Sequence, residues 1–232
     1  MNVGVFTTIK IQNGIPLFWN NHLKRLSSQA EKLNVGSSIL LSIGKIKTYL
    51  KQHNLSNCAL KITATKENNK TEIHYETRPL PQNFSSCKVI TSEDTRNYLK
   101  IYKTTNRIIN EKAKKTAEEN GADDALFILN GTIVESTISN VFGMNKNGEI
   151  ITPPIKAKGL NGITRQLIMK QTNGIETDIN QNTKGPLVLV NCLRIQKISH
   201  INGKKLIDGE RLMKKIKKLI EQKEKEYLSA NI

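Results

Sequence analysis

Hydrophobic and polar residues alternate over short runs in the first part of the chain, and turn residues such as Asn13-Gly14 separate these runs. Alternation predicts strands that bury one face, whereas apolar residues three and four positions apart predict helices. The predicted elements are strands over 3–12 and 15–18, a helix that follows the caps Asn20 and Asn21, a helix over 38–52, and strands over 58–65 and 71–77. Together they form a small α+β unit.

The pattern changes after a short strand predicted over 88–91 and a polar stretch that follows it. We therefore expect a domain boundary near 92–99, with a small α+β domain over 1–94 and a larger domain over 95–232. Turn-connected strands in the larger domain predict a mostly antiparallel sheet. Its elements are helices over 106–120 and 163–171, strands over 125–129, 132–135, 139–145, 149–152 and 187–190, and a terminal helix with the inner stripe Leu212, Ile216, Leu219 and Ile220.

Composition places the chain among globular proteins. Its 232 residues are 37% hydrophobic, which is enough for a sizeable core. No apolar run reaches the roughly 18 residues that a membrane span needs, and the N-terminus has no signal sequence, so we expect a cytoplasmic protein without a membrane partner. The three cysteines show no CxxC spacing, which argues against a disulfide framework or a zinc site.

The net charge is +16, from 36 basic and 20 acidic side chains. Such a charge suits an anionic small molecule or a nucleic acid. The lysines are spread along the chain, however, and the five Phe and five Tyr residues are not interleaved with them as stacking platforms. We therefore expect a small anionic substrate rather than a nucleic acid.

Two residues suggest chemistry. Glu135 lies between Val134 and the apolar Ile138 in a segment that otherwise resembles a buried strand. A buried carboxylate needs a partner because its desolvation is costly, although Glu135 could also be an ordinary strand-end residue. Lys103 lies upstream, ahead of a helical pattern, and the two residues together suggest a lysine and a glutamate that serve one cofactor. Lys100 is the alternative lysine, but the Thr-Thr-Asn sequence after Lys103 favours Lys103.

An enzyme that uses pyridoxal phosphate needs a lysine that binds the aldehyde and moves protons, an acid beside the pyridine nitrogen and a cup for the phosphate. Lys103 and Glu135 are candidates for the first two. Arg25 and the helix start at Ile163 and Thr164 could hold the phosphate, because arginine forks and helix N-termini both bind this group. Taken alone, Arg25 fits a solvated helix face, and His22 beside it fits a packing or capping role.

At these residues the chain resembles the fold-type IV pyridoxal phosphate enzymes, the class IV aminotransferase family. The resemblance covers nearly the whole chain and rests on the order of Gly4 to Thr8, His22 to Leu26, Lys103 to Arg107, Ala122 to Leu126 with Glu135 and Asn140 to Phe142, and Thr152-Pro153 with Gly162 to Arg165. It implies pyridoxal 5'-phosphate as the cofactor, a barrel-like core in the larger domain and a homodimer. Members carry about two dozen residues before the Gly-x-Phe segment, so the resemblance implies either that the recorded start is late or that the small domain is shortened at its start.

Within the family, the segment Val190 to Ile195 is similar to the Asn-Ala/Ser-Leu pattern of aminodeoxychorismate lyases. By this resemblance Asn191 and Cys192 would lie at the phosphate. The expected reaction converts 4-amino-4-deoxychorismate to 4-aminobenzoate and pyruvate for folate synthesis, with Lys103 as the catalytic residue. One alternative is an aminotransferase for D-amino or branched-chain amino acids, and another is a non-catalytic basic binding protein with the same fold.

Overall fold

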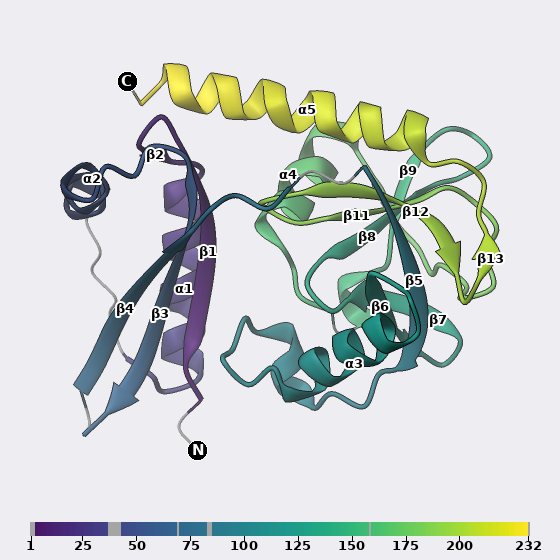
Figure 1. The fold of residues 1–232 in the computed structure, drawn as a ribbon, viewed down its shortest axis with the longest axis horizontal. Helices are drawn as coiled ribbons and strands as arrows, with labels where there is room; N and C mark the ends of the chain where they lie inside the picture. Colours follow the sequence, from purple (N-terminus) through teal and green to yellow (C-terminus); the bar gives the residue numbers. More distant parts are fainter. Residues whose placement is uncertain (1–2, 37–42, 69, 83–84, 158, 232) are drawn as a thin grey trace. The chain divides into compact units, whose positions relative to one another are not determined.

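The alternating residues of the N-terminal region form a four-stranded antiparallel sheet in the computed structural model, which describes residues 3–36, 43–68, 70–82, 85–157 and 159–231 (Figure 1). The strand order is β2-β1-β3-β4. These elements belong to unit 1, the first of two compact units, which comprises Met1–Pro81, Tyr102–Asn106 and Lys223–Ile232. They are β1 (Val5–Gln12), β2 (Ile15–Pro16), α1 (Trp19–Lys32), α2 (Ile43–Gln52), β3 (Cys58–Glu67) and β4 (Lys70–Arg78).

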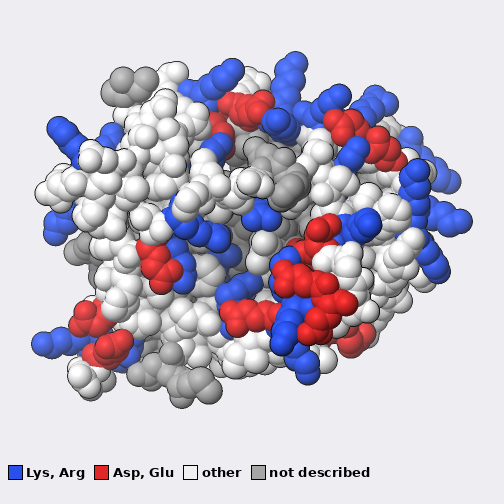
Figure 2. Space-filling view, in the orientation of Figure 1, with Lys and Arg blue, Asp and Glu red and all other residues white. Residues whose placement is uncertain are grey.

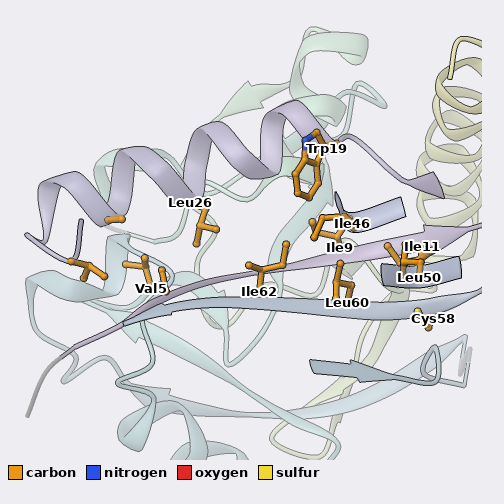
Figure 3. Packing of buried hydrophobic residues seen from close by; sticks show 13 residues of the cluster. Val5, Ile9, Ile11, Trp19, Leu26, Ile46, Leu50, Cys58, Leu60 and Ile62 are labelled. Carbon is orange, nitrogen blue, oxygen red and sulfur yellow. The ribbon is translucent and has the colours of Figure 1, made fainter. Parts of the chain in front are cut away.

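The core of unit 1 lies between this sheet and its helices (Figure 3). Successive side chains of a strand point to opposite faces, so every second residue of β1 faces α1. Thr7 is a polar residue among these core positions. The labelled apolar side chains of the core are Val5, Ile9, Ile11, Trp19, Leu26, Ile46, Leu50, Cys58, Leu60 and Ile62.

Residues 102–106 join unit 1 through backbone hydrogen bonds to Gly4 and to Phe6 of β1. The N–H of Phe6 donates to the carbonyl of Lys103 at 2.8 Å, and the N–H of Thr105 donates to the carbonyl of Gly4 at 2.9 Å. Gly4 permits this approach, since a Cβ at that position would lie 3.2 Å from Cγ2 of Thr105 and 2.8 Å from the carbonyl oxygen of Ala64. The backbone of Lys103 is therefore fixed to β1.

Unit 2 comprises Gln82–Ile101 and Arg107–Gln222 and contains a curled nine-stranded sheet. Its main path is β10-β9-β8-β11-β12-β5-β6-β7, and β13 pairs with β12. The pairs on both sides of β5 and the β9–β10 pair are parallel, while the others are antiparallel, which confirms a mostly antiparallel sheet. The elements are β5 (Ser86–Glu93), η1 (Tyr98–Ile101), α3 (Ile108–Glu119), β6 (Asp124–Leu129), β7 (Thr132–Ser136), β8 (Asn140–Met144), β9 (Ile150–Thr152), η2 (Ile155–Ala157), α4 (Ile163–Thr172), β10 (Ile175–Glu176), β11 (Leu187–Val190), β12 (Ile195–Ile201), β13 (Lys204–Lys205) and the part of α5 (Glu210–Ser229) that ends at Gln222.

Helices bury apolar faces against this sheet. α3 packs Ala113 and Ala117 with Phe127 of β6. Ile168 of α4 joins a cluster with residues of β8, β11 and α5. The predicted inner stripe of the terminal helix is confirmed for Leu212, Ile216 and Ile220, which are buried, and Leu219 packs against the same cluster.

The start of α1 differs from the prediction. Asn20 and Asn21 lie inside the helix, and the N-cap is Phe18, which adopts a left-handed conformation with φ 52°. The N–H of Trp19 donates to the hydroxyl of Tyr227 at 3.1 Å, and the Phe18 and Tyr227 rings lie 5.2 Å apart. A contact with a residue distant in sequence therefore fixes this helix start, and local capping preference does not.

β12 was missed because a β-bulge interrupts its alternation. The pairing of β12 with β5 shifts between Ile198 and His200. A bulge inserts one extra residue into a strand, so the side chains beyond it change face. Gln196, Ile198 and Ile201 are the buried residues of the strand, and their spacing does not follow a strict period of two.

The α+β fold class is confirmed. The division into residues 1–94 and 95–232 stays a prediction, and the contact units differ from it because unit 1 also takes residues 102–106 and the C-terminal part of α5. Residues 38–42 of the predicted second helix lie outside the described residues. Over the described ranges, no helix is long and apolar enough to cross a membrane. On the face drawn in Figure 2, basic side chains are interspersed with acidic ones.

Candidate active site

Lys103 lies in unit 1 against the ring of Phe6. Its Nζ is 4.8 Å from the ring centroid, and the Nζ of Lys61 lies 5.5 Å from the same centroid. The backbone N–H of Lys103 donates to Oε1 of Gln29 on α1 at 3.0 Å. The backbone of the candidate lysine is thus held by β1 and α1, and its ammonium group lies in a cation–π contact.

Arg25 on α1 forms a hydrogen bond with Thr7 on β1, and Thr7 also lies within hydrogen-bond distance of His22. The Arg25 guanidinium donates to Oγ1 of Thr7 at 2.8 Å, and the same oxygen lies 2.7 Å from Nδ1 of His22. A guanidinium only donates hydrogen bonds, so the Thr7 hydrogen is available for a neutral His22 ring. Burial, and then the nearby charges of Arg25 and Lys103, lower the pKa of His22 well below its ordinary value of 6.5. The packing or capping role expected for His22 did not include this contact with the Thr7 hydroxyl.

Glu135 lies in β7 of unit 2, and its side chain is buried. Its Oε1 accepts a hydrogen bond from Arg96 NH1 at 2.7 Å, and its Oε2 accepts one from the backbone N–H of Leu160 at 3.0 Å. Arg96 was not among the predicted site residues. The cationic partner that a buried acid requires is therefore supplied inside unit 2 by this arginine.

Arg96 belongs to a cluster of four buried charged side chains, Asp94, Arg96, Lys100 and Glu135, here called the charge quartet. Asp94 pairs with Arg96 at 2.9 Å and with Lys100 at 2.8 Å. Although burial opposes ionisation, hydrogen bonds and the charges of Arg96 and Lys100 lower the pKa of Asp94. Asp94 and Glu135 together raise the pKa of Arg96 against its own desolvation. Lys100 is committed to this ion pair.

The turn after Glu135 is held by side chains from α3 and β6. The carbonyl of Thr137 accepts hydrogen bonds from Arg107 at 2.6 Å and from Asn110 at 2.8 Å. The Thr137 hydroxyl donates to Asp124, a buried acid of β6. Burial lowers the pKa of Arg107, while the nearby charge of Glu135 opposes that shift. These contacts fix the end of β7 and with it the position of Glu135.

Ile163 and Thr164 begin α4, and the loop before them contacts Glu135 and the turn. The N-cap residue Gly162 has no side chain with which to cap this helix, and the first backbone hydrogen bond runs from the N–H of Gln166 to the carbonyl of Gly162. The N–H groups of the first turn therefore point out of the helix end, as an anion requires. A Cβ on Gly162 would clash with Oδ1 of Asn140, whose amide donates to the carbonyl of Leu160 at 2.8 Å.

Asn191 and Cys192 lie in the loop between β11 and β12, and the side chain of Asn191 shapes this loop. Its Oδ1 accepts hydrogen bonds from the N–H groups of Leu193 at 2.8 Å and Arg194 at 3.0 Å, and its amide donates to Oγ of Ser139 at 3.0 Å. The side chain of Cys192 is partly exposed. Unit 2 thus brings together the turn after Glu135, the start of α4 and this loop.

A comparison of the sequence with known protein families agrees with the arrangement of these candidate site residues. A model of the family described as amino-transferase class IV matches residues 4–184. The chain belongs to this family. Class IV enzymes depend on pyridoxal phosphate, which is the expected cofactor.

Relatives are similar to this chain in sequence, and solved structures match its fold. A D-alanine aminotransferase of Bacillus licheniformis is 28% identical over 205 residues, which are 80% of this chain and 71% of that protein. A Legionella pneumophila protein provisionally named 4-amino-4-deoxychorismate lyase matches with a TM-score of 0.84 at 22% identity, over 95% of this chain and 91% of its own. A hypothetical aminotransferase of Mycobacterium tuberculosis in a PLP-bound form matches with a TM-score of 0.81 at 17% identity, over 95% and 88%.

The residues of unit 2 fit a pyridine ring and a phosphate. A Cβ on Gly159 would lie 3.5 Å from the Glu135 carboxyl group, so the absence of a side chain there keeps space beside the acid. The uncapped start of α4 offers donors that suit a phosphate. Lys103 and Arg25 belong to unit 1, and the other five predicted site residues belong to unit 2.

Proposed function

We propose that this protein is a pyridoxal phosphate-dependent 4-amino-4-deoxychorismate lyase that forms 4-aminobenzoate and pyruvate. The observation that carries the proposal is the loop after β11, where Asn191 begins a segment that resembles the Asn-Ala/Ser-Leu pattern of aminodeoxychorismate lyases. Its side chain closes the loop onto Leu193 and Arg194 and bonds to Ser139. This loop is the chain's strongest resemblance to the lyases.

Each candidate residue has a proposed role toward the cofactor. Glu135 pairs with the ring nitrogen, because it is a buried carboxylate whose oxygens are oriented by two donors. The N–H groups of Ile163 and Thr164 bind the phosphate together with Arg25, and Asn191 and Cys192 line the phosphate loop. Lys103 binds the aldehyde, a role that suits it better than Lys100 because Lys100 is paired with Asp94.

The proposed reaction needs one base that later acts as an acid. The cofactor, when bound, supplies an electron sink for the amine-bearing carbon of the substrate. Lys103 Nζ removes the proton from that carbon, the carbon–oxygen bond to the enolpyruvyl group breaks, and Lys103 returns a proton to the departing group. The ring of the substrate becomes aromatic, which makes the elimination strongly downhill. Pyruvate and 4-aminobenzoate account for all atoms of the substrate.

The second candidate function is a D-amino acid aminotransferase. The observation that favours it is the similarity to D-alanine aminotransferases, at 28% identity over 80% of this chain. Both candidates use the same cofactor, the same lysine and a small substrate that carries a carboxylate. For both we expect a cytoplasmic homodimer, in line with the family resemblance.

Two measurements on the purified chain test these proposals. The first is pyruvate release from 4-amino-4-deoxychorismate without a keto-acid acceptor, which a lyase supports. Transfer of an amino group from D-alanine to 2-oxoglutarate, without any lyase turnover, would favour the second candidate. The other measurement is borohydride reduction of the loaded protein and mapping of the modified lysine. Modification at Lys100, or at neither lysine, would contradict the role proposed for Lys103.

A further inference from the structure

The carboxylate of Glu135 is oriented by two donors that come from different parts of unit 2. Arg96 NH1 binds Oε1 at 2.7 Å, and the N–H of Leu160 binds Oε2 at 3.0 Å. An ionised carboxylate can accept about two hydrogen bonds on each oxygen, so a further acceptor site stays on each oxygen. The plane of the carboxylate is fixed, and its direction depends on Arg96.

Arg96 is held along its edge and across its face. Its Nε and NH2 form a fork with the two oxygens of Asp94 at 2.9 and 3.0 Å, which directs NH1 to Glu135. The carbon Cζ of its guanidinium lies 3.8 Å from the centroid of the Phe127 ring. A planar guanidinium that is bonded and stacked in this way is preorganised, so it can set the position of its third partner.

Lys100 completes the balance of charge around this arginine. The charge quartet holds two carboxylates and two cations, whose side chains are between 0% and 7% exposed. Asp94 neutralises Arg96 in part, and Lys100 neutralises Asp94 in part. Electrostatic interactions in a buried site are strong, so a change in one member alters the negative charge that Glu135 presents.

We propose that Arg96 is a positioning residue that sets the direction and the effective charge of the Glu135 carboxylate toward the ring nitrogen of the cofactor. Asp94 and Lys100 act through Arg96, because their charges set how strongly Arg96 attracts that carboxylate. The proposal rests on the proposed pairing of Glu135 with the ring nitrogen. It extends that function to three residues for which the family resemblance suggested no role.

The test compares two ligands that differ at one ring atom. The full chain, freed of cofactor, is titrated with pyridoxal phosphate and with its carbon analogue, in which C–H replaces the ring nitrogen. A charged hydrogen bond from the ring nitrogen to Glu135 predicts that the wild type prefers pyridoxal phosphate by about ten- to a hundredfold. Arg96→Met should reduce this preference to less than about threefold, and Arg96→Lys should keep part of it.

Two further variants connect the effect to Glu135. Glu135→Gln removes the acceptor charge and should lose the same preference as Arg96→Met, and the double variant should lose no more than either single one. Asp94→Asn leaves Arg96 with Glu135 as its main anion in the quartet, so it should lower the preference to an intermediate value. Lys197→Gln is the matched control, because Lys197 pairs with Asp208 and Glu210 near the surface of the same unit.

The outcomes separate this proposal from the proposed function. If the Arg96 variants weaken both ligands equally, Arg96 has a structural role only and the proposal is wrong. If Arg96→Lys and Asp94→Asn keep the full preference for pyridoxal phosphate over the carbon analogue, the proposal is also wrong. This result counts even if Arg96→Met does not fold. A wild type that binds neither ligand would instead overturn the proposed cofactor function itself.

Discussion

His22 in unit 1 and Glu135 in unit 2 have opposite surroundings. Glu135 belongs to a quartet in which every charge has a buried counter-charge. Arg25 contacts the hydroxyl of Thr7, and beyond it lies His22, whose protonation is opposed by burial and by the cations Arg25 and Lys103. Unit 2 thus holds an acid in one orientation, whereas unit 1 keeps cations beside a neutral ring. The second arrangement suits an anion such as a phosphate.

The largest expected effect separates the two lysines beside Phe6. Lys103→Met should lower lyase turnover by about a thousandfold or more, because it removes the base that also returns the proton. Lys61→Met is the matched control, since Lys61 lies over the same ring but also pairs with Glu76 at 3.0 Å. Pyruvate release measures both variants. Similar losses in both would indicate a general electrostatic effect of unit 1 and contradict the role of Lys103.

A second expectation concerns stability. Arg96→Met leaves two carboxylates of the quartet without their arginine, which should lower the free energy of unfolding by about 3 to 5 kcal/mol. Thr7→Val removes a buried hydroxyl bonded to neutral or cationic partners, and should cost about 1 to 2 kcal/mol.

Urea unfolding monitored by circular dichroism measures both changes. Lys197→Gln, which removes a cation near the surface of unit 2, should cause little change. The contrast between the two regions fails if Arg96→Met is no more destabilising than Thr7→Val, because the quartet would then be a minor contributor to the fold.

A third expectation uses the phosphate. Arg25→Lys replaces a planar fork by a point charge, and should reduce the preference for pyridoxal phosphate over pyridoxal by about tenfold. Lys24→Gln is the matched control on the exposed face of the same helix. Equilibrium titration gives the two affinities. If Arg25→Lys weakens both ligands alike, or Lys24→Gln has the same effect, the phosphate role of Arg25 is wrong.

Much of the fold follows from local patterns, but the corrections come from contacts distant in sequence. Alternation and turn residues predicted most strands of both units, and a helix was predicted at each of the five places where the described residues form an α-helix. The start of α1 depends on Tyr227, and the bulge in β12 depends on its pairing with β5. Neither cause is visible in a window of neighbouring residues.

In the candidate site, too, the contacts that could not be predicted join residues distant in sequence. Glu135 was predictable because an acid among apolar residues requires a reason. Its partner Arg96 is 39 residues away, in a stretch that looked like a polar linker between domains. The available signal was the acid Asp94 and the base Arg96, two residues apart in the polar stretch after the predicted strand. His22 was assigned to packing or capping, because its contact with Thr7 depends on how α1 packs against β1.

The smallest expected effect is a pH dependence that belongs to unit 1. The pKa of His22 is lowered in the folded chain, so between pH 6.5 and its lower folded value the unfolded chain binds a proton that the folded chain does not. His22 therefore favours folding fully above pH 6.5, and this contribution is lost as the pH falls below that value. The pKa of Asp94 is also lowered, but its contribution is lost only under strongly acidic conditions, below the ordinary range of a carboxyl group.

His22→Asn isolates this effect, because the amide oxygen can accept the Thr7 hydrogen bond and does not titrate. The free energies of unfolding of the wild type and His22→Asn are compared from pH 7.5 to pH 5. As the pH falls, the wild type should lose about 1 to 2 kcal/mol of unfolding free energy relative to His22→Asn. The contributions of the other titrating groups cancel in this comparison. Parallel curves would mean that the folded chain accepts a proton on His22 readily. The cations of unit 1 would then not oppose charge at this position, and the contrast with the charge quartet would disappear.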